Sequence, residues 1–145
     1  MKKMLTSMMS GTAAMVMATS VTAMAEVPAS PTFTKDIMPI LQENCQTCHR
    51  PGGDNMSGMI APMSLMDYQE TRPWAKAIMK AVENKTMPPW HAGEKFNGHF
   101  KNERTLTAEE IATIVSWVET GAKRGNPADA PAPVEFREGY FMGEP

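Results

Sequence analysis

The feature that most constrains this chain of 145 residues is the pentapeptide Cys45-Gln46-Thr47-Cys48-His49. It contains the only two cysteines of the sequence, and a histidine follows the second one directly. If the segment is helical, the two thiols lie about one turn apart on the same side, next to an imidazole. Three reactive side chains so close together mean that the fold is organised around them or around what they bind.

Four chemistries can use this pattern. Two thiols can add to the vinyl groups of a haem while the following histidine binds its iron. The alternatives are a thiol–disulfide redox pair, a structural disulfide, and a zinc site completed by His91 or His99. A redox pair usually opens a helix behind a strand, and neither of the other two needs a histidine directly after the second cysteine. The pattern therefore favours one covalently attached haem c, with Cys45 and Cys48 as thioether attachments and His49 as an axial iron ligand.

An iron that carries electrons rather than binding a substrate needs a sixth ligand. Met87 is predicted for this position, because it opens the segment Met87-Pro88-Pro89-Trp90, in which two prolines fix the loop. A thioether ligand raises the haem potential, which suits an electron carrier. Met87 can instead be a core methionine, and other side chains can take its place. These alternatives are His91, His99, Met56, Met59, Met63 and Met66.

The four loop methionines also admit a copper(I) site, since soft thioethers select that ion. The competing explanation is that a loop folded over a porphyrin needs flexible apolar side chains. Separately, Arg72, Trp74 and Trp90 are candidates for contacts in the haem pocket or with its propionates, which an apolar pocket cannot otherwise tolerate. Core packing of the tryptophans and a solvated helix start for the arginine are the ordinary alternatives.

The composition indicates a folded domain with 42% apolar and 21% charged residues. The formal charge of −2 argues against a nucleic-acid partner. The sequence contains no Ser/His/Asp set, no phosphate-binding loop and no paired carboxylates in a plausible cleft, so we expect no enzyme site. A second Cys-x-x-Cys-His, which a two-haem peroxidase needs, is also absent.

Residues 1–25 have the layout of a cleaved secretory signal peptide. Lys2 and Lys3 precede an uncharged stretch, and Ala23-Met24-Ala25 offers the small residues that signal peptidase recognises. An uncleaved membrane anchor is the alternative, but Ser, Thr and Gly dilute the stretch. We therefore expect a periplasmic or otherwise exported protein without a membrane span after cleavage. Residues 26–145 hold 12 basic and 16 acidic side chains, a charge of −4, which weakly favours a partner with a basic patch.

The remaining sequence predicts an all-α domain over residues 26–126, with three main helices and long loops, followed by an extended Pro-rich tail over 127–145. The first helix is expected from Asp36, as its cap, to about Thr47, with Pro39 in its first turn. The second is expected over 73–84 with Thr71 as a cap. The third begins with a capping box at Thr107 and ends near Gly121. Its buried stripe is expected to be Ile111, Ile114, Val115 and Val118.

These motifs together resemble the monohaem cytochromes c of the small all-helical class. The resemblance spans about residues 33–131 and implies first and last helices that cross at the haem edge, with His49 and Met87 axial. The segments that carry it are Asp36-Ile37-Met38-Pro39-Ile40-Leu41, the pentapeptide 45–49, Arg72-Pro73-Trp74-Ala75-Lys76, Met87-Pro88-Pro89-Trp90, and the last helix with Trp117 and Gly121.

The Met-Pro-Pro-Trp segment further resembles a bacterial subgroup in which the cytochrome often leads a protein related to copper monooxygenases. The end of the chain, from Phe136 to Pro145, is similar to the start of such a following domain. The resemblance implies electron transfer with redox protein partners, such as a dehydrogenase, an oxidase or a monooxygenase. The alternative function is a haem-based sensor or small oxidoreductase with an open or displaceable sixth site.

Overall fold

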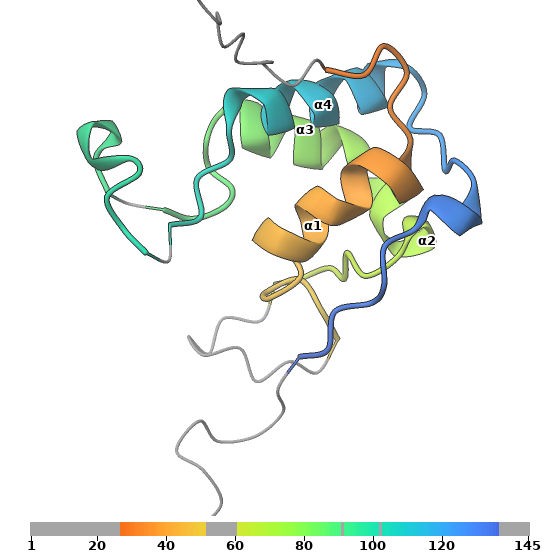
Figure 1. Cartoon of the computed structure of the whole chain (residues 1–145), viewed down its shortest axis with the longest axis horizontal. Coiled ribbons are helices and arrows are strands. Elements are labelled where there is room, and N and C mark those ends of the chain that lie inside the picture. Colours follow the sequence, from red (N-terminus) through yellow and green to blue (C-terminus); the bar gives the residue numbers. More distant parts are fainter. Residues whose placement is uncertain (1–26, 52–60, 91, 102, 137–145) are drawn as a thin grey trace, which may run out of the picture.

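The structure, a computed structural model, describes residues 27–51, 61–90, 92–101 and 103–136. These residues form helices and loops without a strand, which confirms the all-α class (Figure 1). The α-helices among them are α1 (Met38–Asn44), α2 (Tyr68–Thr71), α3 (Ala75–Glu83) and α4 (Ala108–Glu119). Tighter or wider helical turns are η1 (Phe33–Ile37), η2 (Arg72–Trp74), η3 (Glu94–Phe96) and η4 (Pro127–Asp129). The predicted signal peptide, residues 1–25, lies outside the described residues.

The first helical segment starts earlier and ends earlier than predicted. It begins with the π-helical turn η1 after Thr32, so the prediction that Asp36 caps it is wrong. The Asp36 carboxylate instead accepts a hydrogen bond of 2.7 Å from the backbone N–H of Thr32, one turn before it. Pro39 lies in the first turn of α1 as predicted, where its missing N–H leaves no bond unmade. The helix ends at Asn44, so the cysteines lie in the turns that follow it.

The second helical segment also begins earlier than predicted. Asp67 caps it, because its side chain accepts a hydrogen bond of 2.9 Å from the backbone N–H of Glu70. The expected cap, Thr71, is fully buried within the segment. Pro73 lacks the N–H of a continuous ladder, and the chain passes through the 3-10 turn η2 before α3 begins. The prediction of a single helix from residue 73 is therefore corrected to α2, η2 and α3.

The last helix, α4, begins with the predicted capping box. Glu110 N–H donates to the Thr107 hydroxyl at 3.1 Å, and Thr107 N–H donates to the Glu110 carboxylate at 2.7 Å. Gly121, with φ of 101°, ends the helix as predicted. Its fully buried side chains differ from the predicted stripe, because Trp117 and Thr113 join Ile114 on the inner face while Val115 is only half-buried.

A single apolar core joins the beginning, middle and end of the described chain. Phe33 packs edge-on against Tyr68 at 5.5 Å between ring centroids and lies 6.0 Å from the Trp117 ring. The Trp117 indole N–H donates to the Lys123 carbonyl at 3.0 Å, so this large side chain is buried without an unpaired polar atom. The core residues are Phe33, Ile37, Ile40, Leu41, Leu65, Ala75, Ile78, Val82, Ile114, Trp117 and Ala122.

Two loop regions lie outside this core. Residues 92–101 project beside the helical body, on the left in Figure 1, and contain the turn η3. Residues 126–136 follow α4, and their predicted extended course starts with the short turn η4. In the part of the chain that the structure describes, no helix is long and apolar enough to cross a membrane.

We expect Gly125→Ala to destabilise the fold clearly more than Gly98→Ala. Both glycines have positive φ, 85° and 80°, so each substitution costs about 1 kcal/mol of backbone strain. At Gly125 the new Cβ would also lie 2.6 Å from Thr32 Cβ, whereas at Gly98 it meets nothing within 4 Å. The closure of the first segment on the last should then lose about a further 2 kcal/mol. Urea denaturation measures both free energies of unfolding, and equal losses would contradict the contact.

Candidate functional site

The pentapeptide 45–49 forms tight turns directly after α1. Cys45 N–H and Gln46 N–H both donate to the Leu41 carbonyl, at 2.9 and 2.8 Å, which ends the helix. His49 N–H then donates to the Cys45 carbonyl at 2.9 Å. The prediction that the cysteines lie within a helix is therefore corrected, but the turn still keeps them close to the histidine. Both thiols are free rather than joined in a disulfide.

A second segment, residues 61–66, is hydrogen-bonded to this turn. The Gln46 side chain, 1% exposed, donates to the Leu65 carbonyl at 3.0 Å, and Leu65 N–H donates to the His49 carbonyl at 3.0 Å. The His49 Nδ1 lies 3.1 Å from the Met63 carbonyl oxygen. With its proton on Nδ1, the imidazole donates to this carbonyl and keeps Nε2 as a lone-pair donor for a metal.

The turn forms one wall of a cavity of about 450 Å³, a size that is ordinary for a cofactor site. The opposite walls come from α3 and from the Met-Pro-Pro segment. Its lining is predominantly apolar. The lining residues are Asn44, Cys45, Cys48, His49, Ala61, Pro62, Met63, Leu65, Ala77, Ile78, Ala81, Val82, Thr86, Met87, Pro88, Pro89 and Arg104.

The donor set of this cavity fits a covalently held haem. Cys45, Cys48 and His49 come from one wall, and Met87 comes from another. The apolar alanine and valine side chains of α3 offer the surface that a porphyrin face requires. Ala77 is exposed in the protein structure although it lines the cavity, as is expected of a residue whose partner is a bound group. Sequence reasoning thus named four residues that the fold brings to one cavity.

Burial also shapes the chemistry of the first cysteine. Burial above all, and then the neighbouring Glu110 and Cys48, raise the pKa of the Cys45 thiol to about 12. Before a haem is attached, the thiol is therefore protonated and uncharged at neutral pH, which agrees with the apolar wall. Glu110 itself accepts a hydrogen bond from the Asn44 side chain at 3.3 Å, which joins the end of α1 to the start of α4.

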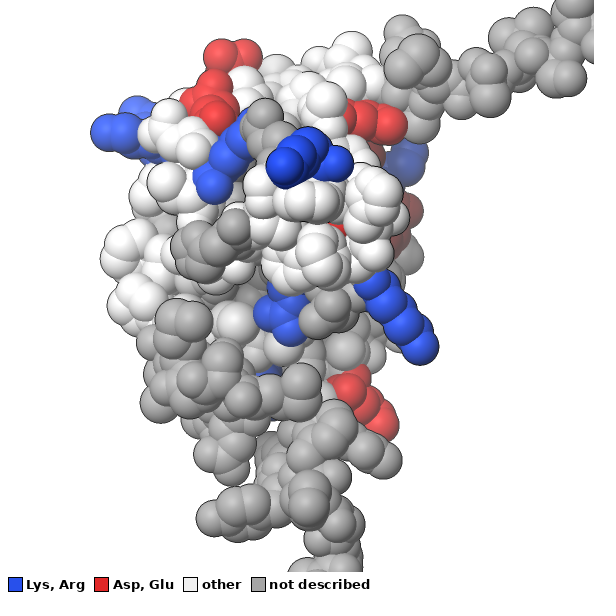
Figure 2. Space-filling view, turned by 90° about the vertical axis from the view of Figure 1, so that its left-hand side faces the viewer, with Lys and Arg blue, Asp and Glu red and all other residues white. Residues whose placement is uncertain are grey.

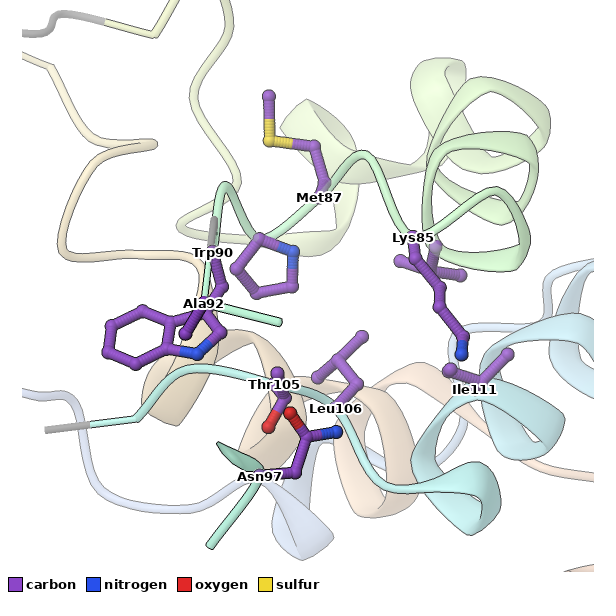
Figure 3. Close-up of a pocket in the computed structure, with 10 residues that line it drawn as sticks. Lys85, Met87, Trp90, Ala92, Asn97, Thr105, Leu106 and Ile111 are labelled. Carbon is purple, nitrogen blue, oxygen red and sulfur yellow. The ribbon is translucent and has the colours of Figure 1, made fainter. Parts of the chain in front are cut away.

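Met87 is held at the cavity by the end of α3. Thr86 N–H and Met87 N–H both donate to the Ala81 carbonyl, at 2.9 and 3.3 Å. The Met87 side chain is 44% exposed, so its thioether is not packed within the apolar core. Figure 3 shows it pointing away from Trp90, Thr105 and Leu106, which line a smaller neighbouring cavity of about 190 Å³.

Of the three predicted pocket contacts, Trp90, Trp74 and Arg72, only Trp90 lines a cavity. Trp90 lines the smaller cavity beside Met87 and packs edge-on against Phe100 at 5.6 Å. Its indole N–H is buried and has no hydrogen-bond partner among the described residues, so it can serve a bound acceptor. Trp74, 43% exposed, and Arg72, also exposed, line neither cavity.

The alternative iron ligands have different positions. Met63 lines the large cavity, but His99 is exposed in the projecting loop, where its ring lies 6.5 Å from that of Phe96. His91, Met56 and Met59 lie outside the described residues. Among the described residues, no group of three or more His, Cys, Asp or Glu side chains could hold a metal ion.

Arg104 is a cavity residue that sequence reasoning missed. Its guanidinium Nη1 donates to Cys48 Sγ at 3.8 Å, and it is the only charged side chain among the described residues that line the large cavity, apart from the ionisable cysteines and histidine. Its place in a polar, glycine-containing stretch predicts only a surface loop. The capping box that starts at Thr107, three residues later, could have indicated that Arg104 lies near the helix start.

We expect Gln46→Ala to destabilise the protein by about 2 kcal/mol, because it leaves the buried Leu65 carbonyl unpaired. Gln42→Ala is the matched control, since that side chain donates to the Ala132 carbonyl at 2.9 Å at an exposed site. The control should cost about 0.5 kcal/mol or less. Thermal or urea unfolding measures both, and a Gln46 variant as stable as the control would refute the tie between 45–49 and 61–66.

Comparison with known proteins agrees with this site. The family model described as cytochrome c matches residues 38–122, which is more than half of the chain and includes the cysteines, His49 and Met87. No curated protein and no solved structure matches the chain. Cytochromes c carry covalently attached haem c, and Cys45 and Cys48 fit the attachment motif. The chain therefore belongs to the cytochrome c family, and its cofactor is a covalently attached haem c.

Proposed function

We propose that this protein is an exported monohaem cytochrome c that passes single electrons between redox proteins. The observation that carries the proposal is the convergence of Cys45, Cys48, His49 and Met87 on one apolar cavity. In this assignment the two cysteines would attach the haem, and His49 and Met87 would bind its iron. When bound, the haem iron alternates between ferric and ferrous states, which supplies the one-electron chemistry.

The residues of the chain have distinct parts in this function. The Met63 carbonyl orients His49 through its Nδ1–H and makes the imidazole a better ligand. The cavity wall of α3 excludes water and lowers the local dielectric constant, which limits the reorganisation that accompanies each electron transfer. The exposed part of the Met87 side chain faces this cavity, so a bound haem would cover it.

Export and partner class belong to the same proposal. The basic start and small-residue cleavage site of residues 1–25 support transport to the periplasm or beyond the membrane. The Met87-Pro88-Pro89-Trp90 segment supports the bacterial subgroup that resembles electron-delivering domains of copper monooxygenase-like proteins. A dehydrogenase, an oxidase or a monooxygenase is then the partner class. The competing function, a haem sensor or small oxidoreductase, requires that Met87 is readily displaced.

Met87→Ala tests the sixth ligand. The protein is exported from a host that matures cytochromes c, and its visible spectrum is recorded oxidised and reduced. We expect the wild type to show low-spin bands and the weak far-red band of a methionine–iron bond, and the variant to lose that band and have a lower potential.

Met63→Ala is the control for this experiment, because Met63 lines the same cavity but gives its backbone carbonyl, not its side chain, to His49. It should keep the far-red band. An unchanged Met87→Ala spectrum would exclude Met87 as the ligand, and a high-spin wild type would favour the sensor or oxidoreductase. A colourless, folded protein would contradict the haem site itself.

Arg104→Gln tests the charge on the cavity wall. A positive charge stabilises the ferrous state, which carries one positive charge less than the ferric state, so its removal should lower the potential. The expected shift is on the order of 1 kcal/mol, or roughly 40 mV for one electron. Lys123→Gln removes the same charge from an exposed site and should shift the potential much less. Redox titration measures both shifts, and equal shifts would show that the Arg104 charge affects the haem potential no more than a distant surface charge does.

A further inference from the structure

The Pro-rich segment after α4 returns along the surface of the molecule to the turn that follows α1. Figure 1 shows it in dark blue, passing from η4 beside α1 toward the gold-coloured chain after that helix. Two contacts define its course. The Gln42 side chain donates to the Ala132 carbonyl at 2.9 Å, and the Arg50 guanidinium carbon lies 4.6 Å from the centre of the Phe136 ring. Residues 127–136 are called the tail strap below.

The strap starts from a fixed point on the first helical segment. Thr34 N–H and the Thr34 hydroxyl both donate to the Arg124 carbonyl, at 2.9 and 3.1 Å. The Asn126 side chain then accepts a hydrogen bond of 3.1 Å from Ala128 N–H and begins η4, which contacts η1. The strap therefore leaves the core with a defined position and direction.

Prolines reduce the conformational entropy that the strap loses when it is ordered. Pro127, Pro131 and Pro133 have a fixed φ, and each disfavours helical geometry for the residue before it. The unfolded chain is restricted as well, so few contacts suffice to hold such a segment in place. In the strap, Pro131 and Phe136 are half-buried and the other residues are exposed.

The two contacts of the strap bracket the pentapeptide 45–49. Gln42 lies three residues before Cys45, and Arg50 directly follows His49. The main chain covers this span in eight residue steps and turns sharply, whereas the strap covers it in the four steps from 132 to 136. Four extended residues reach at most about 14 Å. A strap held at both ends therefore limits how far the two sides of the turn can separate.

Arg50 is the point at which the strap contacts the site. Figure 2 shows Lys and Arg side chains that project from the surface, as is usual for solvated cations. Arg50 is half-buried instead, because its guanidinium lies over the Phe136 ring while its Nε donates to the Thr47 carbonyl at 3.4 Å. One side chain thus bonds back to the pentapeptide and stacks on the strap. A movement of the turn away from the strap breaks the ring contact.

We propose that the tail strap positions the haem-bearing turn, with the Phe136 ring on Arg50 as its far anchor. The inference rests on the proposed axial ligands and adds a positioning element that lies outside the haem motif. The hydrogen bonds to 61–66 orient the imidazole, whereas the strap holds the turn as a whole. A haem attached to this turn moves with it, so the strap also controls how closely the iron approaches the Met87 wall. A looser strap should let Met87 leave the iron more often.

Cyanide binding to the ferric, haem-loaded protein measures how often this ligand leaves. Cyanide reaches the iron only after the sixth ligand has left, so the observed rate constant levels off at the opening rate when cyanide is in excess. Phe136→Leu keeps an apolar side chain but removes the aromatic face. We expect it to raise the limiting rate constant, measured by stopped flow, about threefold, which corresponds to a cation–π contact at a partly exposed site.

Two further variants identify the contact. Phe136→Trp keeps an aromatic face, so its limiting rate constant should equal the wild-type value or lie below it. Val134→Ala shortens an exposed side chain of the same strap and should change the rate constant by less than about a third. If either variant binds cyanide as fast as Phe136→Leu, the aromatic anchor is not what restrains the turn, and the proposal is wrong.

A double variant with Arg50→Gln shows whether the ring acts through the turn. Without the cation, Phe136→Leu should change the limiting rate constant by less than about a third, because the two residues share one contact. A threefold effect that persists in the Arg50→Gln protein would mean that Phe136 acts elsewhere, which overturns the proposal.

Amide hydrogen exchange keeps the test independent of the proposed sixth ligand. His49 N–H donates to the Cys45 carbonyl at 2.9 Å and exchanges when the turn opens. We expect about threefold faster exchange in Phe136→Leu, and equal exchange would overturn the positioning role of the strap. A wild-type rate constant that rises with cyanide concentration without levelling off would contradict Met87 as the sixth ligand, while exchange at His49 still decides about the strap.

Discussion

The site depends on the short set of hydrogen bonds between the pentapeptide 45–49 and the segment 61–66. Gln46 donates to the Leu65 carbonyl, Leu65 donates to the His49 carbonyl, and His49 contacts the Met63 carbonyl, all at 3.0 to 3.1 Å. The Gln46 bond is buried, where an unpaired carbonyl is costly, so the two segments cannot separate cheaply. This tie fixes the direction of the imidazole and, through the Leu65 side chain, anchors the turn to the apolar core.

The core in turn places the opposite walls of the cavity. The Phe33 and Trp117 rings bring the start and the end of the domain together, and α4 packs on both η1 and α3. The helix α3 therefore has two tasks at once. Its Ile78 and Val82 side chains are buried in the core while they also reach the cavity, and Ala77 and Ala81 complete the cavity wall. The end of α3 then holds Met87 through the Ala81 carbonyl.

The charged residues of the chain are distributed unevenly along the sequence. The acidic surplus lies in the segments before residue 72 and after residue 104, whereas the segment that carries Met87 is basic.

The sequence by itself determined the cofactor chemistry, the all-α class, the capping box at Thr107 and the stop at Gly121, because each depends on residues within a few positions of one another. It predicted Met87 as the sixth iron ligand, and the fold brings Met87 to the wall of the same cavity as the cysteines and His49. The sequence did not predict that the helical segments begin at Phe33 and Tyr68. The hydrogen bonds at these starts, between Thr32 and Asp36 and between Asp67 and Glu70, involve residue types that cap helices equally well at nearby positions. Only the tertiary structure decided that Trp117 is central, that Trp74 and Arg72 stay outside the cavity, and that Arg104 reaches Cys48. Those facts depend on contacts between segments far apart in the chain, which no local pattern specifies.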